Sequence, residues 1–328
     1  MNMPNYKERL GASFISRDSS TTIRRAIESL KPYCNQIVVV DTGSIDNSPN
    51  IASLLGADVF FLKWNNNFAE ARNYALSLMR TDWIISLDTD EELDSKSLER
   101  NSGLFLNNDI GGISVIIDNF LNENDISQKS THRYTRIFRR HPLIRYEGSI
   151  HEQIAETITG NGLQIAESDI LIHHYGYLNT SESKKSRNKE LLEQELSQNQ
   201  SDVWLKYHLG ETEFSMNNFP RAEELFSAIY QSQQLSVEQR EKAAIRLSQI
   251  KLKKGDSRAV LALLNFKCSN SDNEGLKLFI QAAAYLDMKD FDSAYKLYNM
   301  PELISSNLVD KSIVKKAIDA LNRIFNER

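Results

Sequence analysis

Short apolar segments alternate with amphipathic segments along the first ninety residues. In four segments apolar residues follow one another almost without a break, as in buried strands: 12–16, 36–41, 58–62 and 83–87. Three intervening segments place apolar residues three and four positions apart, the spacing of one helix face: 23–30, 51–55 and 68–79. Strands that alternate with helices in this way predict a parallel α/β sheet.

Polar residues stand where these predicted strands end. Ser16 ends the first strand, Asp41 closes the second, and Asp88, Thr89 and Asp90 follow the fourth. Because parallel strands end at one edge of the sheet, we expect these side chains at the edge where α/β sheets bind ligands. Two aspartates at i and i+2 suit Mg²⁺ or Mn²⁺, which bridge to substrate phosphates. A solvated acidic turn explains the same pair, and a helix cap explains Asp41 equally well.

Two nucleotide-binding motifs are absent after the first strand. The chain has neither a Gly-x-Gly-x-x-Gly segment nor a Walker loop, so dinucleotide binding and P-loop chemistry are not supported. A metal-dependent nucleotidyltransferase usually carries a glycine-rich phosphate loop there, and residues 14–22 contain no glycine.

Later segments of the first half continue the sheet. Residues 94–109 are polar and helix-like, 112–117 form another strand, and 119–131 read as a polar loop on the acceptor side. Alternation over 134–139 predicts a strand with its arginines, Arg139 among them, on one face. Those guanidinium groups either bind phosphate or simply face solvent.

Two histidine-containing segments carry candidate chemistry. His151 and Glu152 follow Gly148, and a carboxylate such as Glu152 suits the removal of a proton from an acceptor. A buried, hydrogen-bonded histidine explains His151 without any function. Residues 170–177 form a strand that runs into His173 and His174, of which only one can face inward.

The composition changes after residue 180 and an internal repeat follows. Residues 183–196 form a charged helix at the expected junction, and Leu209-Gly210 precedes Ala222 and Phe226. Further alanines stand 37 and 35 residues on, at Ala259 and Ala294, close to the ~34-residue tetratricopeptide unit. Residues 308–325 read as a capping helix, so the second half is expected to be a short helical solenoid.

Charge and hydropathy exclude several classes of protein. The formal net charge of −5 argues against bulk nucleic-acid binding. No apolar stretch approaches the ~18 residues of a membrane span, and the polar N-terminus lacks an apolar signal core. Cys34 and Cys268 are isolated from each other, which favours a reduced, cytoplasmic protein.

Four features in order resemble family 2 glycosyltransferases of the GT-A fold: strand 12–16 with its turn, Val39–Ser44, Phe68–Asn73 and Leu87–Asp90. This resemblance implies that Asp41 contacts uracil and that Glu152 is the catalytic base, with His151 orienting the acceptor or the phosphates. The resemblance also implies a nucleotide-sugar site and a metal site for Mn²⁺ or Mg²⁺. The nucleotide-sugar residues would be Ile15, Ser16, Asp41, Ala71, Arg72, Asn73, Asp88, Thr89 and Arg139, and the metal ligands Asp90, Asp88 and His174.

Further segments narrow the resemblance. Gly-x-x-His-Glu at 148–152, His-x-Gly-Tyr at 174–177, a basic helix and a Trp-containing repeat are similar to sublancin-type peptide S-glycosyltransferases and their bacterial relatives. The implied activity is that of an inverting hexosyltransferase that uses a UDP-sugar. Its acceptor would be a peptide Cys or Ser side chain, or a glycan or lipid-linked precursor. The histidine register favours His174 over His173 as metal ligand.

The predicted organisation is a GT-A domain at residues 1–180 and a helical tetratricopeptide-like domain at 181–328. The repeats would hold the acceptor, bind a second subunit in a homodimer, or only buttress the catalytic domain. The alternative is an adaptor whose repeats do the work beside a catalytically weak transferase-like domain. The donor sugar, the acceptor and the oligomeric state stay open.

Overall fold

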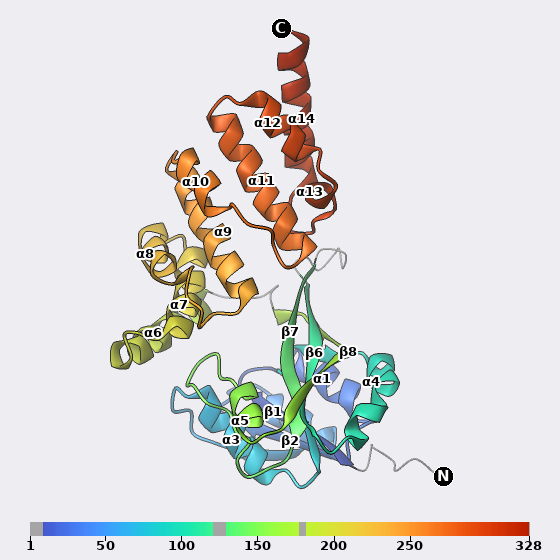
Figure 1. Cartoon of the computed structure of the whole chain (residues 1–328). Helices are drawn as coiled ribbons and strands as arrows, with labels where there is room; N and C mark the ends of the chain where they lie inside the picture. Colours follow the sequence, from blue (N-terminus) through green and yellow to red (C-terminus); the bar gives the residue numbers. More distant parts are fainter. Residues whose placement is uncertain (1–8, 121–128, 177–181, 328) are drawn as a thin grey trace. The chain divides into compact units, whose positions relative to one another are not determined.

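The computed structural model describes residues 9–120, 129–176 and 182–327. The chain divides into two compact units, Met1–Thr180 and Ser181–Arg328. Figure 1 shows an α/β unit and a unit built from helices. Each unit is described by itself.

A mixed eight-stranded sheet forms the centre of the α/β unit, in the order β3-β2-β1-β4-β7-β6-β8-β5. The strands are β1 (Leu10–Ser16), β2 (Gln36–Asp41), β3 (Asp58–Phe61), β4 (Trp83–Ser86), β5 (Glu91–Leu93), β6 (Ile110–Phe120), β7 (Lys129–Arg139) and β8 (Gln164–His174). The helices are α1 (Ile23–Leu30), α2 (Ser48–Leu54), α3 (Phe68–Leu78), α4 (Ser95–Arg100), the 3-10 helix η2 (Ser102–Leu106) and α5 (Ala155–Gly160).

Only the first half of the sheet has the parallel arrangement that the sequence predicts. β3, β2, β1 and β4 are parallel, whereas β7 runs antiparallel to β4 and β6 antiparallel to β7. β8 returns parallel to β6, and the unpredicted β5 pairs antiparallel with β8. The strand order reverses at β1, which lies between β2 and β4, and such a switch point opens a crevice at the carboxyl ends of the strands.

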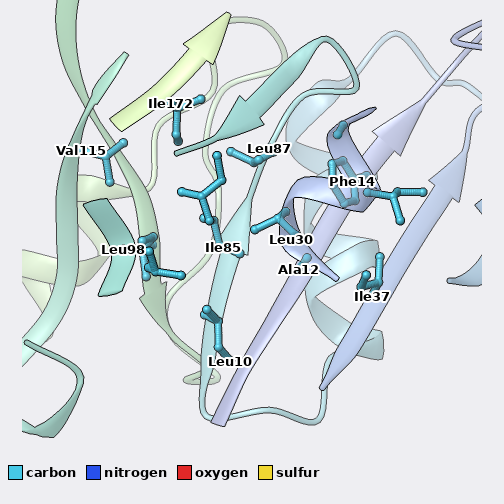
Figure 2. Packing of buried hydrophobic residues seen from close by; sticks show 14 of the residues in the cluster. Leu10, Ala12, Phe14, Leu30, Ile37, Ile85, Leu87, Leu98, Val115 and Ile172 are labelled. Carbon is cyan, nitrogen blue, oxygen red and sulfur yellow. The ribbon is translucent and has the colours of Figure 1, made fainter. Parts of the chain in front are cut away.

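Helices cover both faces of the sheet because alternate strand residues are apolar on each side. One core joins Leu10, Ala12 and Phe14 of β1 to α1, α2, α4 and η2, and Figure 2 shows Phe14 and Ile85 within it. The other core packs α3 and α5 against β2, β4 and β7. The sheet is thus held between two apolar layers that fix the strand ends.

Two predicted segments differ in the structure. The described ends of the loop expected at 119–131 are strands, since β6 continues to Phe120 and β7 starts at Lys129, with residues 121–128 outside the described chain. The polar residues there are stabilised by pairing, because buried Asp118 accepts hydrogen bonds from Lys129 and Thr131. The helix expected over 94–109 is divided into α4 and η2.

The helical unit contains paired antiparallel helices, as the repeat predicts. Its elements are α6 (Glu182–Gln198), α7 (Val203–Ser215), α8 (Phe219–Ile229), α9 (Val237–Lys253), α10 (Ser257–Leu263), α11 (Ser271–Asp287), α12 (Phe291–Tyr298), α13 (Pro301–Ser305) and α14 (Lys311–Asn326). Ala222 and Ala294 are fully buried, and a Cβ on Gly210 would lie 2.8 Å from the Phe226 ring. Small residues at these repeat positions therefore allow close helix contact.

Candidate active site

The loops after β1, β2 and β4 are hydrogen-bonded to one another at the carboxyl edge of the sheet. The Asp18 N–H, after β1, donates to Ser44 Oγ, after β2, at 2.9 Å. Asp41 is buried at the end of β2, and its carboxylate accepts hydrogen bonds from the backbone N–H groups of Gly43 and Ser44, at 3.0 and 2.8 Å. Thr89 donates a hydrogen bond to Ser19 in the loop after β1. Ser16, at the end of β1, buries a hydroxyl that has no hydrogen-bond partner among the described residues. The predicted base-contacting Asp41 thus first organises its own loop, and Ser16 keeps a polar atom at the switch point.

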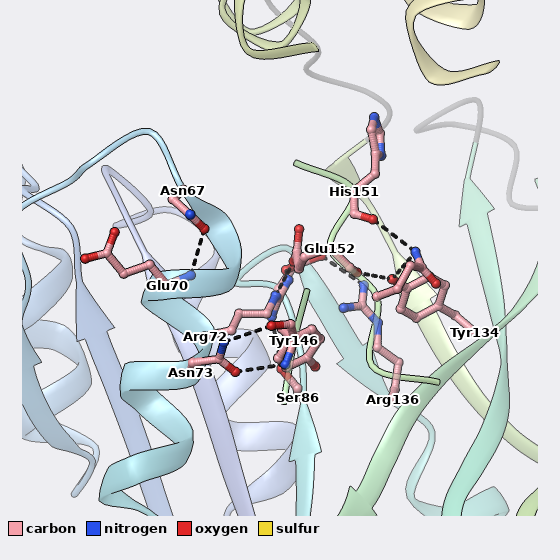
Figure 3. A network of polar contacts seen from close by, with 12 residues as sticks. Asn67, Glu70, Arg72, Asn73, Ser86, Tyr134, Arg136, Tyr146, His151 and Glu152 are labelled. Carbon is pink, nitrogen blue, oxygen red and sulfur yellow. Dashed lines mark hydrogen bonds and ion pairs between the residues drawn. The ribbon is translucent and has the colours of Figure 1, made fainter. Parts of the chain in front are cut away.

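Arg72 is the hub of a buried charge network (Figure 3). Its side chain, 6% exposed, leaves α3 and donates to Glu152, to Ser86 Oγ at 2.9 Å and to Asp88 Oδ1 at 2.6 Å. Burial alone would lower the pKa of Arg72, but Asp88 and Glu152 raise it above its ordinary value. Arg72 therefore stays charged and connects the acidic strand end with Glu152.

A second arginine holds the other side of Asp88. Arg136 of β7 donates to Asp88 Oδ2 at 2.9 Å and to Glu91 Oε1 at 2.7 Å. Desolvation opposes ionisation of Asp88, but Arg136 and Arg72 hold its pKa well below the usual range. Burial raises the pKa of Glu91, whose Oε2 also accepts the Asp88 N–H at 2.8 Å. Both Asp88 oxygens are thus occupied by guanidinium groups.

Asp90 faces the late histidine instead. The pairing of β5 with β8 places Glu91 opposite His174, so that His174 Nε2 lies 3.6 Å from Asp90 Oδ1. Burial would lower the pKa of His174, but the interaction with Asp90 and the neighbouring carboxylates raise it. Any Cβ on Gly176 would lie 2.1 Å from Asp90 Oδ2 and 2.6 Å from His174 Nε2. Glycine in the His-x-Gly segment therefore leaves the space that this pair occupies, and Tyr177 lies outside the described residues.

The segment around Glu152 is fastened to α3. The Asn73 amide exchanges two hydrogen bonds with the Tyr146 backbone, and the Phe68 N–H donates to the Ser149 carbonyl. His151 has a φ of +53°, so the chain turns there. Figure 3 shows the His151 ring directed away from Arg72 and Glu152. The structure thus brings Glu152 to the network and leaves the His151 ring outside it.

Arg139 was predicted to belong to the nucleotide-sugar site, but the structure places it away from Asp88. It pairs with Trp83 at the start of β4, so it lies at the opposite edge of the sheet from Asp88. Its guanidinium donates to the carbonyls of Ile110 and Asn107 and stacks on the Trp83 ring. Position along the strand explains the difference: β7 runs antiparallel to β4, so residues before Arg139 lie closer to the carboxyl end of β4, where Arg136 reaches Asp88. Arg136 stands in the same predicted arginine-bearing strand but was not among the residues predicted for the nucleotide-sugar site.

The remaining predicted residues have simpler positions. Ile15 is half-buried near the end of β1, and Ala71 is a fully buried residue of α3. Ile15 and Ala71 have apolar side chains, so these side chains contribute packing and no hydrogen bonds. Glu91 and Ser86 also belong to the network and were missed, since a single acidic or hydroxyl residue in a strand carries no distinctive sequence signal.

The three predicted metal ligands are not gathered into one group. Within the described ranges, no three His, Cys, Asp or Glu side chains form a group that could hold a metal ion. Asp90 and His174 face each other, whereas Asp88 pairs with Arg72 and Arg136, and the predicted ligand set stays a prediction. One carboxylate and one imidazole fit a Mn²⁺ or Mg²⁺ ion whose other positions are filled by water and phosphate oxygens. The two arginines pair with three carboxylates, Asp88, Glu91 and Glu152, whereas Asp90 faces His174.

The fold and this acidic strand end define a GT-A domain, the Rossmann-like fold of nucleotide-diphosphosugar transferases. The family model for Glycosyl transferase family 2 matches residues 13–164. Over these residues the α/β domain of the chain is similar to glycosyl transferase family 2.

Several known proteins are similar to this chain. The TPR repeat-containing protein Synpcc7942_0270 of Synechococcus elongatus is 29% identical over 60% of this chain and 50% of its own length. The SPbeta prophage-derived glycosyltransferase SunS of Bacillus subtilis is 24% identical over 55% of this chain and 43% of its own. A solved structure of glucosyl-3-phosphoglycerate synthase from Mycobacterium tuberculosis, with Mn²⁺ and UDP-glucose, is 16% identical, with a TM-score of 0.42. It covers 59% of this chain and 80% of that one.

The chain spans about half the length of these curated relatives. The tetratricopeptide-containing relative agrees with the helical repeats of the second unit, and SunS agrees with the narrower resemblance. Across the described residues, no helix has the length and apolar character needed to cross a membrane.

Proposed function

We propose that this chain is a metal-dependent, inverting glycosyltransferase that moves a sugar from a UDP-sugar to an acceptor. The observation that carries the proposal is the meeting of Asp90 with His174 beside the Arg72–Asp88–Arg136 network. This group stands at the carboxyl edge next to the switch point at β1, where nucleotides lie in doubly wound folds.

Each residue has a role in this proposal. Asp90 and His174 would hold a Mn²⁺ or Mg²⁺ ion, which when bound supplies charge neutralisation for the departing diphosphate. The Ser16 hydroxyl and the loop organised by Asp41 would contact the nucleoside. Arg72 and Arg136 keep Asp88 ionised and fixed in place, so the acidic edge is preorganised before the donor enters.

Glu152 is the proposed base. Its carboxylate shares Arg72 with Asp88 and is 11% exposed, so it lies beside the donor site and can reach a bound acceptor. The acceptor proton would pass to Glu152 as the acceptor oxygen or sulfur attacks the anomeric carbon. The acceptor would be a peptide Cys or Ser side chain or a glycan precursor, held by the repeats.

The adaptor alternative also has an observation in its favour. Asp88 is neutralised by two arginines, and two protein donors alone would bind a metal ion weakly without a diphosphate. Calorimetry with UDP and Mn²⁺ separates the two functions. No binding at about millimolar ligand, a Kd that corresponds to only ~4 kcal/mol, would favour the adaptor.

The direct test is a panel of UDP- and GDP-sugars scored for metal-dependent hydrolysis, which needs no acceptor. We expect one UDP-sugar to be hydrolysed and EDTA to abolish the reaction. Asp90→Asn should lower the rate by about 100-fold or more, because it removes a charged metal ligand. Asp58→Asn, at the start of β3 and the opposite edge of the sheet, is the matched control and should leave the rate unchanged. Full activity of Asp90→Asn or in EDTA would refute the metal role.

Glu152→Gln tests the base. Glutamine keeps the shape and the acceptor oxygen for Arg72 but cannot take a proton. With a hydroxyl acceptor we expect transfer to fall by about 10²- to 10⁴-fold while UDP binding, measured by calorimetry, persists. Glu156→Gln, an exposed glutamate in the first turn of α5, is the control. Turnover close to wild type would remove Glu152 as base, although a thiol acceptor would need less help.

A further inference from the structure

Asn119 is a buried amide on β6 that the proposed chemistry does not use. It is 3% exposed, and strand pairing places it opposite Ser130 of β7 and His174 of β8. Its Nδ2 lies 3.1 Å from the Ser130 carbonyl oxygen and 2.9 Å from His132 Nδ1. Its Oδ1 lies 2.7 Å from His174 Nδ1. One side chain thus joins a histidine on each neighbouring strand.

The backbone carbonyl of Ser130 fixes which way this amide points. A carbonyl oxygen only accepts hydrogen bonds, so Asn119 must turn its NH₂ group toward Ser130. If the amide were flipped, Asn119 Oδ1 would face the Ser130 carbonyl oxygen, and two acceptors would meet without a proton between them. Oδ1 therefore faces His174, and because Oδ1 also only accepts, His174 Nδ1 must carry the proton.

The position of that proton decides what His174 presents to Asp90. The charged ring presents an N–H to both Asn119 Oδ1 and Asp90. Because the Asn119 contact is 2.7 Å and the Asp90 contact 3.6 Å, the neutral ring keeps the proton on Nδ1 and has its lone pair on Nε2. Metal-binding histidines are commonly oriented by a hydrogen bond from their other nitrogen. We infer that Asn119 is a positioning residue that holds His174 as the Nδ1–H tautomer, with Nε2 directed at Asp90 as a metal ligand. The metal part rests on the proposed function, whereas the tautomer does not.

The same amide sets the opposite tautomer in His132. The second Nδ2 hydrogen of Asn119 points at His132 Nδ1, which must therefore accept, so neutral His132 carries its proton on Nε2. The two histidines on either side of Asn119 thus have different tautomers. This difference is a signature that simple packing of Asn119 would not produce.

Two-bond ¹H–¹⁵N NMR of the full metal-free chain measures both tautomers at alkaline pH, where imidazole is neutral. His174→Gln and His132→Gln assign the two signals. We expect Nδ1–H for His174 and Nε2–H for His132 in the wild type. Asn119→Leu should abolish both preferences. Asn119→Asp, which has an acceptor oxygen on both sides, should preserve the Nδ1–H of His174 and change His132 from Nε2–H to Nδ1–H.

The outcomes separate this inference from the proposed function. A wild-type His174 that is mainly Nε2–H, or an unchanged His174 tautomer in folded Asn119→Leu, would overturn the positioning role. Calorimetry with Mn²⁺ and UDP should show binding weakened about 10- to 100-fold in Asn119→Leu and near wild type in Asn119→Asp. Equal Mn²⁺ affinity in all three proteins would overturn the metal part. A wild type with the expected tautomers and no Mn²⁺ binding would refute the proposed function and leave the tautomer assignment standing.

Discussion

The two units of this chain use ion pairs in different ways. In the α/β unit, Arg72 and Arg136 are buried and converge on the same carboxylate, Asp88. In the helical unit, Arg246 pairs with Glu211 across α7 and α9, and both side chains are about one-third exposed. The helical unit does bury Lys277, but that ammonium is satisfied by one glutamate and one backbone carbonyl.

The two kinds of ion pair differ in burial and therefore in their expected contribution to stability. Isolated pairs between helices fix the contact of two elements and stabilise it by little. A buried cluster with more carboxylates than arginines is costly to desolvate and is weak evidence for stability alone. The proposed function gives this cluster a binding role, and variants in each unit can test the contrast.

The largest expected effect is that of Arg72→Met. Its loss leaves the largely buried Glu152 without a cation and removes one of the two cations from the partly exposed Asp88, which should lower the free energy of unfolding by about 3–5 kcal/mol. Urea unfolding followed by circular dichroism measures the change. Arg246→Met in the helical unit is the matched control, with an expected loss of about 1 kcal/mol or less. Equal losses in the two variants would remove the contrast between the units.

Gly176→Ala should have a smaller and more local effect. The new methyl group displaces the Asp90 and His174 side chains, which can move, so the fold should persist while Mn²⁺ affinity in the presence of UDP falls about 10- to 100-fold. Calorimetry measures the affinity. Gly103→Ala, where a Cβ meets nothing within 4 Å, is the control. If Gly176→Ala bound Mn²⁺ as tightly as this control does, Asp90 and His174 would not be the ligands.

The smallest expected effect is the acid response of Asp46. Burial opposes ionisation slightly, but hydrogen bonds from Ser48 and Ser20 lower the pKa of Asp46 to about 2, from an ordinary 3.8. A depressed folded-state pKa contributes stability above the unfolded value, and that contribution disappears as the pH falls from about 4 toward 2. The urea midpoint of the wild type should thus fall more steeply between about pH 5 and 3 than that of Asp46→Asn. If the urea midpoints of the wild type and of Asp46→Asn fell equally with pH, the lowered pKa of Asp46 would be contradicted.

Much of the site was predictable because its signals are local. An apolar run that stops on Asp88-Thr89-Asp90 marks a strand end from sequence alone, and the His-x-Gly spacing selects His174 over His173. Arg139 was assigned to the wrong edge because the register between β7 and β4 is a long-range property. The strand ends at 119–120 and 129–131 were expected to be loop because polar residues such as Asp118 and Asn119 are buried only through cross-strand partners.

The sequence by itself determined the first four predicted strands, the helices between them, the acidic strand end and the repeat, since period and turn residues depend on neighbours along the chain. It did not predict β5 or the division of residues 94–109 into α4 and η2. Only the tertiary structure decided the division of labour between the two aspartates. Asp88 is enclosed by Arg72 and Arg136, whereas Asp90 meets His174, because α3, β7 and β8 approach β4 and β5 from different sides. Those approaches depend on strand pairing between residues far apart in sequence, which no local pattern contains.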